Sequence, residues 1–331
     1  MTNLLIELPN PPQGKTGWPW TEGSDSIPER MPDGSEWPKI SIVTPSYNQA
    51  QYLEETIRSV LLQGYPNLEY IIIDGGSTDG SVEIIKKYEP WLSYWVSEPD
   101  RGQSHAINKG FERSTGEIMA WINSDDYYKP NAFKNVVDIY KNSNNTSLAF
   151  IHGKSIIINS DNYALSEKGS EFNFINSLKN STNPIAQSSV FLIRDKVKSI
   201  GYLDETLHMS MDWDLYVRLA LEHSTLFTTQ ILSFFRQSET TKTSLNKVGF
   251  GPDMVKVLNK VYQNNKIAKS LIDIKSEAYS SAYIRCIGGY IRINNKNLAR
   301  KSFIKALLHK PSSALTKSKK YYRYLFFSSN R

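Results

Sequence analysis

Three short apolar segments between Lys39 and Phe133 each run into a polar or acidic cluster, and amphipathic stretches separate them. The segments are KISIVT (39–44), YIIID (70–74) and EIMAWI (117–122). This alternation predicts successive strand–helix units of a parallel sheet. Open α/β sheets bind ligands at the carboxyl ends of their strands, which share one edge. We therefore expect the three polar clusters to meet at a single binding site.

The stretch between the first two strands has helical spacing. Leu53, Ile57, Val60 and Leu61 fall on one face, and Gly64 and the proline two residues later end the helix. The second strand is continuously apolar, as expected when helices cover both faces of the sheet.

The cluster GGSTDGS (75–81) is compatible with few known ligand loops. Its glycines lack the spacing of a dinucleotide-binding fingerprint, and it has no Walker-type Gly-Lys pair. A turn that caps the next helix through Ser77, Thr78 or Asp79 accounts for the loop. It does not account for Asp74, because a carboxylate that ends a buried strand needs a partner to offset its desolvation.

Four motifs in this order resemble the signatures of the family 2 glycosyltransferases, which have the GT-A fold. They are TPSYNQAQYLEETIRSVLLQ (44–63), IIIDGGSTDGS (71–81), DRGQSHAINKG (100–110) and NSDD (123–126). The resemblance covers residues 39 to 236. It implies an enzyme that moves a sugar from a nucleotide-diphosphate sugar to an acceptor, with inversion and with a divalent cation, Mg²⁺ or Mn²⁺.

The resemblance also implies the nucleotide-binding residues. Those expected around the nucleoside are Thr44, Pro45, Tyr47, Asn48 and Asp74. An ionised carboxylate only accepts hydrogen bonds, and the imide N–H of uracil or thymine donates one, so Asp74 favours a UDP- or dTDP-sugar.

A second group of nucleotide-binding residues is implied by the third motif. Asp100, Gly102 and Asn108 are expected near the nucleotide, and Arg101 and Lys109 are candidates for the diphosphate. Lys109 as a solvated helix residue is an equal alternative. His105 is expected to be structural.

The NSDD motif corresponds to the DxD metal motif, with Asn123 at its first acidic position. Asn123 and Ser124 are expected at the nucleotide, Asp125 as the principal metal ligand and Asp126 as a secondary one. The alternative for this acidic pair is the N-cap of a helix.

The segment MDWDLYVRLALE (211–222) resembles the family's acidic segment that carries the catalytic base. Asp212 is the expected base, and Met211 stands where an acidic neighbour is common. The alternative is an N-cap aspartate. Asp214 and Arg218 are four residues apart and are expected to form a structural ion pair.

We predict an α/β, GT-A-type, mixed and mainly parallel sheet flanked by helices, with an α-helical C-terminal extension. The predicted ranges are an extended N-terminal arm (1–36), a glycosyltransferase domain (37–245) and a basic helical extension (246–331). Trp18 and Trp20 are expected to hold the arm on the domain surface. The single cysteine, Cys286, excludes an internal disulfide and fits a reducing compartment. With no apolar run of membrane-spanning length and no signal segment, the expected location is cytoplasmic.

Positive charge gathers at the C-terminus. Residues 278–331 contain twelve Lys and Arg and no Asp or Glu, whereas the whole chain has a formal charge of +6. The tail from residue 310 also carries aromatic residues, so it suits an anionic membrane surface and a peripheral position at the inner face of the membrane. A solvated basic face is the alternative, and no nucleic-acid motif accompanies the charge.

The predicted function is inverting transfer of a sugar to a glycan or lipid-linked acceptor hydroxyl, in polysaccharide or cell-surface glycan synthesis. The donor sugar, acceptor and linkage are left open. One alternative is a nucleotide-sugar-binding protein with weak catalysis, as Asn123 and Met211 suggest. The other is a dinucleotide-dependent oxidoreductase, which the glycine spacing disfavours.

Overall fold

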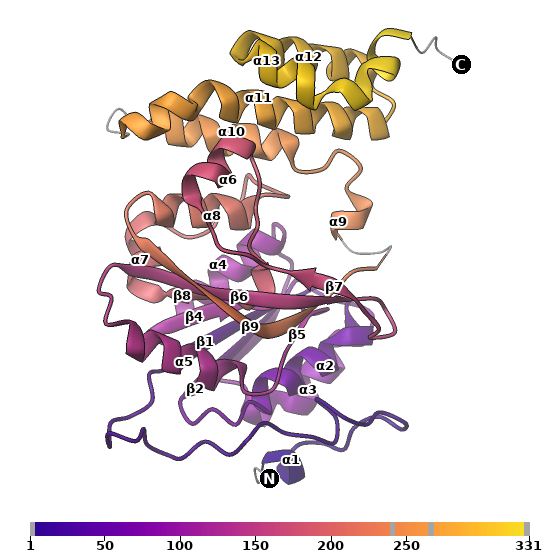
Figure 1. Cartoon of the computed structure of the whole chain (residues 1–331). Coiled ribbons are helices and arrows are strands. Elements are labelled where there is room, and N and C mark those ends of the chain that lie inside the picture. The colour runs from indigo at the N-terminus through magenta and orange to yellow at the C-terminus, as the bar shows by residue number, and fades with distance from the viewer. Residues whose placement is uncertain (1–3, 239–241, 264–267, 328–331) are drawn as a thin grey trace. The chain divides into compact units, whose positions relative to one another are not determined.

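The computed structural model describes residues 4–238, 242–263 and 268–327 (Figure 1). The chain divides into two compact units that alternate along the sequence. The first contains 1–171, 185–205 and 219–237, and the second contains 172–184, 206–218 and 238–331. The sequence-based ranges 1–36, 37–245 and 246–331 differ from this division, because two inner segments join the C-terminal helices.

The first unit is built on one sheet of nine strands in the order β3-β2-β1-β4-β8-β6-β9-β5, with β7 paired to β6. Strands β1 to β4 are mutually parallel, and β8 joins them antiparallel to β4. This mixed, mainly parallel sheet confirms the predicted fold class. The strands are β1 Ile40–Ser46, β2 Leu68–Asp74, β3 Tyr94–Ser97, β4 Ile118–Trp121, β5 Tyr127–Tyr128, β6 Leu148–Ile158, β7 Ala164–Lys168, β8 Val190–Ile193 and β9 Ser224–Arg236.

Strand register places the predicted polar clusters at one edge. Ser46 at the end of β1 lies opposite Asp74 at the end of β2, and Asp74 lies opposite Ser97 at the end of β3. The neighbouring β4 ends at Trp121, two residues before the NSDD motif. The carboxyl ends of the four strands thus bring the loops after them together.

Helices cover the sheet of the first unit. They are α1 Leu4–Glu7, α2 Ala50–Leu61, α3 Ser81–Tyr88, η1 Glu89–Trp91, α4 Gln103–Arg113, α5 Ala132–Ser143, η2 Gln187–Ser189 and α7 Arg194–Ile200. The four apolar residues predicted for one face of α2 are buried in the core, where each contributes roughly 1.5–3 kcal/mol. Helix α4 approaches β1 closely, since a Cβ on Gly110 would lie 2.4 Å from Val43 Cγ1.

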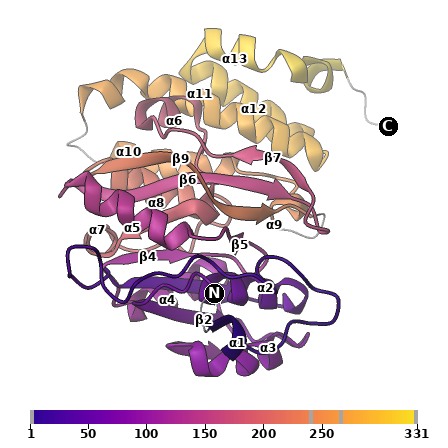
Figure 2. The same ribbon diagram turned by 60° about the horizontal axis from the view of Figure 1, so that its bottom comes forward.

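The described N-terminal segment, 4–36, follows the surface of the first unit (Figure 2). Trp18 Nε1 donates to the carbonyl of Tyr128 at 2.8 Å, and Trp20 is buried. The buried guanidinium of Arg58 on α2 donates to the carbonyls of Pro9, Pro19 and Trp20 at 2.7–2.9 Å. One cation of α2 therefore fastens this segment at three points.

The second unit is helical. Its helices are α6 Phe174–Asn180, the first part of α8 Met211–Ala220, α9 Lys242–Leu245, α10 Gly251–Gln263, α11 Lys269–Arg292, α12 Lys296–His309, α13 Pro311–Lys317, η3 Lys319–Tyr321 and η4 Arg323–Phe327. The predicted helical extension is confirmed. Buried Trp213 donates to Ser177 Oγ at 2.8 Å, and Ser181 Oγ donates to the carbonyl of Ala278. These bonds explain why the inner segments belong to this unit.

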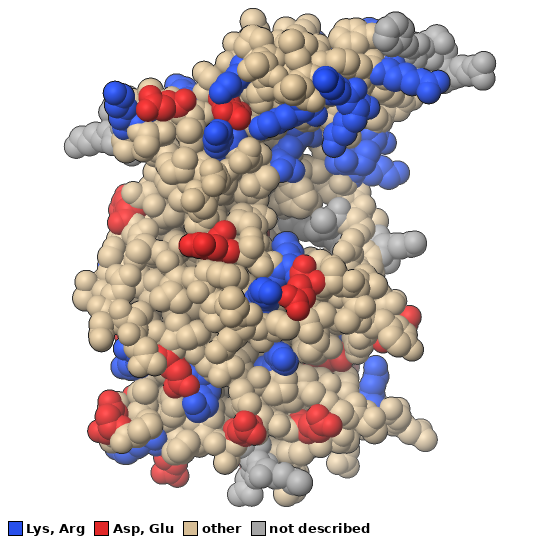
Figure 3. Space-filling view, in the orientation of Figure 1, with Lys and Arg blue, Asp and Glu red and all other residues tan. Residues whose placement is uncertain are grey.

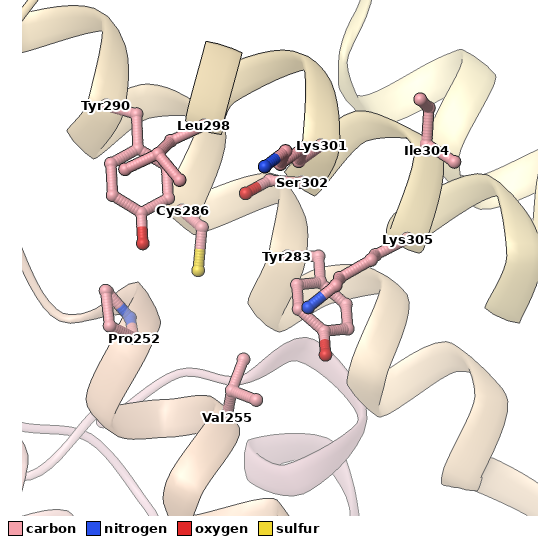
Figure 4. Close-up of a pocket in the computed structure, with 10 residues that line it drawn as sticks. All are labelled: Pro252, Val255, Tyr283, Cys286, Tyr290, Leu298, Lys301, Ser302, Ile304 and Lys305. Atoms are coloured by element: carbon pink, nitrogen blue, oxygen red, sulfur yellow. The ribbon is translucent and has the colours of Figure 1, made fainter. Parts of the chain in front are cut away.

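A cavity of about 430 Å³ opens among α10, α11 and α12 (Figure 4). Its walls combine aliphatic and aromatic side chains with Lys301 and Lys305 of α12. Lys and Arg side chains are numerous over the C-terminal helices in the view of Figure 3. None of the helices in the described ranges has both the length and the hydropathy needed to cross a membrane.

Candidate active site

Asp74 organises the loop after β2. Its Oδ2 accepts hydrogen bonds from the N–H groups of Gly76 and Ser77 and from Ser97 Oγ, and its Oδ1 accepts one from Ser77 Oγ at 2.6 Å. Asp74 is fully buried, so these donors supply the partner that its desolvation requires. Oδ1 accepts one hydrogen bond from the described residues and has a lone pair left for another donor.

Asn48 joins the loops after β1 and β2. Its Oδ1 accepts from Thr78 N at 2.9 Å, and its own N–H donates to Ser77 Oγ at 2.8 Å. Its φ of 52° lies in the left-handed region, which asparagine tolerates. Asp79 accepts from the N–H of Ser81, the first residue of α3, although the N-cap position itself is Gly80 and not Ser77, Thr78 or Asp79.

Tyr47, Gly75 and Asp100 lie close together. A Cβ on Gly75 would lie 2.8 Å from Asp100 Oδ2 and 3.3 Å from Tyr47 Cδ2. The side chain of Tyr47 remains 62% exposed, so its ring is available for stacking. By contrast, Thr44 is buried, with its hydroxyl 3.0 Å from the Tyr70 hydroxyl, and the neighbouring Pro45 is buried too.

The predicted diphosphate residues have protein partners. Arg101 binds Glu205 Oε2 through Nε at 3.0 Å and Nη2 at 2.8 Å. Lys109 forms an ion pair with Glu98, which lowers the pKa of that exposed carboxyl.

Asp100 and Asn108 have different environments. Gly102 donates its N–H to Asp100 Oδ1 at 2.7 Å and has a φ of 113°, which favours glycine. Asn108 bonds both the N–H and the carbonyl of Leu203, so its amide links α4 to the 201–205 loop. His105 accepts a hydrogen bond from Arg101 N.

Asn123 is the centre of an amide network. Its Nδ2 donates to Asp126 Oδ2 and to Gln187 Oε1, both at 3.2 Å, and its Oδ1 accepts from Gln103 Nε2 at 2.7 Å. An ionised aspartate at this position could only accept hydrogen bonds. The departure from the DxD pattern therefore fits the donors and acceptors that surround it.

Asp125 and Asp126 have unequal surroundings. Asp126 is buried and accepts from Arg236 N at 2.8 Å and from Asn123. Burial, together with the negative charge of Asp125, raises the pKa of Asp126 well above its usual range. The half-buried Asp125 carboxylate accepts no hydrogen bond from any other residue within the described part of the chain, and burial raises its pKa as well.

The protein oxygens fit a divalent cation whose other ligands are phosphate and water. Across the described ranges, no group of three or more His, Cys, Asp or Glu side chains is placed to hold a metal ion. Asp125 nevertheless offers an unbonded carboxylate, and Mg²⁺ bound with substrate phosphates commonly takes only one or two protein carboxylates. Asp126 has both of its oxygens occupied.

Several residues around the acidic turn were missed in the sequence. Buried Arg236 donates through Nε to the carbonyl of Asp125 and through Nη2 to Glu55. Thr56 Oγ1 donates to the carbonyls of Ser124 and Asp126 at 3.0 and 2.6 Å, while the Ser124 side chain is buried. The only sequence signal was the charged residue at the end of the largely apolar β9, because Glu55 lies on the polar side of α2, opposite Leu53 and Ile57.

Asp212 lies in the second unit, in the first turn of α8. Its Oδ2 accepts a hydrogen bond from Asn183 Nδ2 at 2.9 Å. Asp214 is fully buried and binds Arg218 Nε and Lys260 Nζ, each at 2.8 Å. The predicted Asp214–Arg218 pair is confirmed. Asp214 is bound by two cations, whereas Asp212 accepts a hydrogen bond from an amide.

The sheet with its loops at one edge defines an α/β transferase of the GT-A type, and the comparisons agree. Residues 41–201 match the family "Glycosyl transferase family 2". An uncharacterized glycosyltransferase of Rickettsia typhi is 30% identical over 224 residues, which are 64% of this chain and 68% of the relative. The chain belongs to glycosyl transferase family 2 and is a glycosyltransferase.

Shorter and more distant similarities extend this result. The putative teichuronic acid biosynthesis glycosyltransferase TuaG of Bacillus subtilis is 41% identical over 95 residues, covering 28% of this chain and 38% of TuaG. Residues 1–349 of S. aureus TarS superpose with a TM-score of 0.61 at 16% identity, covering 88% of this chain and 94% of that one. A mannosyltransferase of Pyrobaculum calidifontis, in complex with GDP-Man and Mn²⁺, has a TM-score of 0.57 at 17% identity, covering 87% and 83%. These two structures share the fold.

Proposed function

We propose that the enzyme transfers a sugar, with inversion, from a UDP- or dTDP-sugar to a hydroxyl of a glycan or lipid-linked acceptor, in polysaccharide or cell-surface glycan synthesis. The observation that carries the proposal is the convergence of exposed Tyr47, buried Asp74 and the unbonded Asp125 carboxylate at the carboxyl ends of β1, β2 and β4. TarS has been solved with UDP-GlcNAc, and TuaG carries a teichuronic acid biosynthesis name.

The nucleoside is proposed to bind at the ends of β1 and β2. Tyr47 offers a ring for the base to stack on, and the free lone pair of Asp74 Oδ1 accepts an imide N–H. Asp100 and Tyr47 both pack close to Gly75, where a side chain would not fit. Arg101 would have to leave Glu205 to bind the diphosphate, and a 69% exposed side chain can do so at little cost.

Asp125 is proposed to hold the divalent cation. The fit lies in its unbonded oxygens and in its raised pKa, since a cation beside the carboxylate offsets the cost of burial. When bound, Mg²⁺ or Mn²⁺ supplies positive charge that stabilises the departing nucleotide diphosphate. The neighbouring Asp126 is held by hydrogen bonds from Asn123 and Arg236.

Asp212 is proposed as the general base that takes the acceptor hydroxyl proton. The N-terminus of α8 favours its ionised form, and the amide of Asn183 orients one of its oxygens. The buried Asp214 is unsuited to this role because two cations occupy its carboxylate.

A lipid-linked acceptor is supported by the surface of α12. Ile304 and Leu308 are 55% and 80% exposed, beside Lys301 and Lys305. Neither lysine has a carboxylate within ion-pair distance among the described residues. Apolar side chains flanked by cations that lack a carboxylate partner suit an anionic bilayer surface.

Asp212→Asn tests the proposal. The amide keeps the shape but cannot take a proton, so transfer should fall by roughly 10²–10⁴-fold while donor affinity stays within a few-fold. Both are measured by nucleotide release with acceptor across a panel of UDP-, dTDP- and GDP-sugars and by donor titration. Asp273→Asn, at an exposed position of α11, is the matched control. Near-normal transfer by Asp212→Asn would show that another residue is the base. If the protein only binds nucleotide sugars, even the wild type would release no nucleotide.

A further inference from the structure

The guanidinium of Arg236, at the end of β9, is 1% exposed and uses all three of its nitrogens. Nε donates to the Asp125 carbonyl at 3.0 Å and Nη2 donates to Glu55 Oε2 at 2.6 Å. Nη1 reaches the turn between β6 and β7, where its acceptors are the carbonyls of Asn159 and Ser160 and the side chain of Asn162. One side chain therefore joins α2, the β6–β7 turn and the acidic turn after β4.

The main chain of Arg236 also bonds the acidic turn. Arg236 N donates to Asp126 Oδ1 at 2.8 Å, while its side chain binds the carbonyl of Asp125. With one aspartate fixed at its carboxylate and the other at its carbonyl, the turn has little freedom to rotate. The Asp125 carboxylate is left out of this network.

Asn162 is hydrogen-bonded to both members of the buried ion pair between Arg236 and Glu55. Its Oδ1 accepts from Arg236 Nη1 at 2.7 Å, and its Nδ2 donates to Glu55 Oε1 at 3.0 Å. Tyr52 lies beneath the guanidinium, 4.3 Å from ring centroid to Cζ. Asn162 has a φ of 65°, which explains why an asparagine occupies the turn.

A buried ion pair is weak evidence for a role in stability, because apolar side chains of similar volume often serve as well. The contacts here are specific, since they end on the two residues of the proposed metal turn. We propose that Arg236, with Glu55 and Asn162, is a positioning cluster that fixes the Asp125–Asp126 turn so that the Asp125 carboxylate faces the cation and the donor diphosphate. This inference rests on the proposed function, since it assumes cation binding at Asp125.

Asn162→Gly and Arg236→Lys test the cluster. Glycine accepts the positive φ and removes only the side-chain bonds, while lysine keeps the charge and loses the planar fork. Mn²⁺ affinity, measured by titration with UDP present, should fall by roughly 10–100-fold in Arg236→Lys and in the same direction in Asn162→Gly. UDP binding in EDTA should be unchanged. The two effects should be less than additive in the double variant, because the residues share one network.

Glu167→Gln is the matched control, because it removes an exposed ion pair with Lys154 from the same β6–β7 hairpin. Wild-type protein that binds no Mn²⁺ with UDP would contradict the metal site of the proposed function, and this inference with it. Wild-type binding together with Mn²⁺ affinities within two-fold in the folded variants would overturn the cluster alone. A loss that only follows the unfolded fraction, measured by circular dichroism, would overturn it too. If Arg236→Lys does not fold, Asn162→Gly decides.

Discussion

Adjacent aspartates can have opposite roles when their bonding differs. Asp126 has both oxygens bonded, one to Asn123 and one to Arg236, while neither oxygen of Asp125 is bonded to another of the described residues. Replacing Asp125 by Ala should therefore lower transfer by roughly 10²–10³-fold, since the departing diphosphate loses its cation. The rate is measured with added Mn²⁺ and after EDTA, which should abolish activity. Asp195→Ala removes an exposed carboxylate of α7 as the control, and unchanged turnover in EDTA would contradict the metal role.

His152 provides a test of how stability depends on pH. It is fully buried in β6 beside Phe150 and Phe227, and neither ring nitrogen has a hydrogen-bond partner within the described residues. Burial lowers its pKa from 6.5 to about 4. The unfolded chain thus takes up a proton before the folded one, so this residue favours folding above pH 6.5 and loses that effect as the pH falls toward 4.

The corresponding variant is His152→Leu. Wild type should lose about 2 kcal/mol more of its free energy of unfolding than the variant between pH 7.5 and pH 5.0, at 1.36 kcal/mol per pKa unit. Urea unfolding at the two pH values measures the difference. Equal losses in the two proteins would show that His152 titrates normally in the fold.

At the scale of elements, the C-terminal tail is partly folded onto its neighbours. Lys310 and Lys317 bind Glu277 of α11 at 2.9 and 3.6 Å, and Tyr322 packs edge-on against Phe303 of α12. Deleting 310–331 should weaken sedimentation with anionic vesicles, because α12 keeps Lys301 and Lys305, and should leave turnover on a soluble acceptor intact. The deletion also uncovers Phe303, and residues 328–331 lie outside the described ranges, so charge substitution is the sharper test.

Lys301→Gln combined with Lys305→Gln provides that test. At about 1 kcal/mol per cation near anionic lipid, the double variant should bind anionic vesicles about 30-fold more weakly. Wild-type binding should also weaken as salt rises. Lys196→Gln with Lys198→Gln, on α7 of the first unit, removes the same charge as a control. If the wild-type protein does not bind anionic vesicles at low salt, the basic surface is only a solvated face and not a membrane-binding one.

At the scale of the whole molecule, local patterns predicted the parallel strands, the α2 face and the C-terminal helices. Those patterns depend on residues close in sequence, whereas the division into units depends on distant pairs such as Trp213 with Ser177. The Asp125–Asp126 turn shows the same limit. Asp125 could be named from its motif, but the separations of Arg236 from Glu55 and from Asp126 are 181 and 110 residues, and no spacing rule covers them.

Helix α2 connects the N-terminal segment to the active edge through successive side chains. Thr56 donates to the carbonyls of Ser124 and Asp126, and two residues later Arg58 donates to the carbonyls of Pro9, Pro19 and Trp20. A shortened chain that began at the first strand would strip the acceptors from this buried cation. Trimming the protein to the strands and helices that follow would therefore remove the partners of Arg58 without removing any residue of the proposed site.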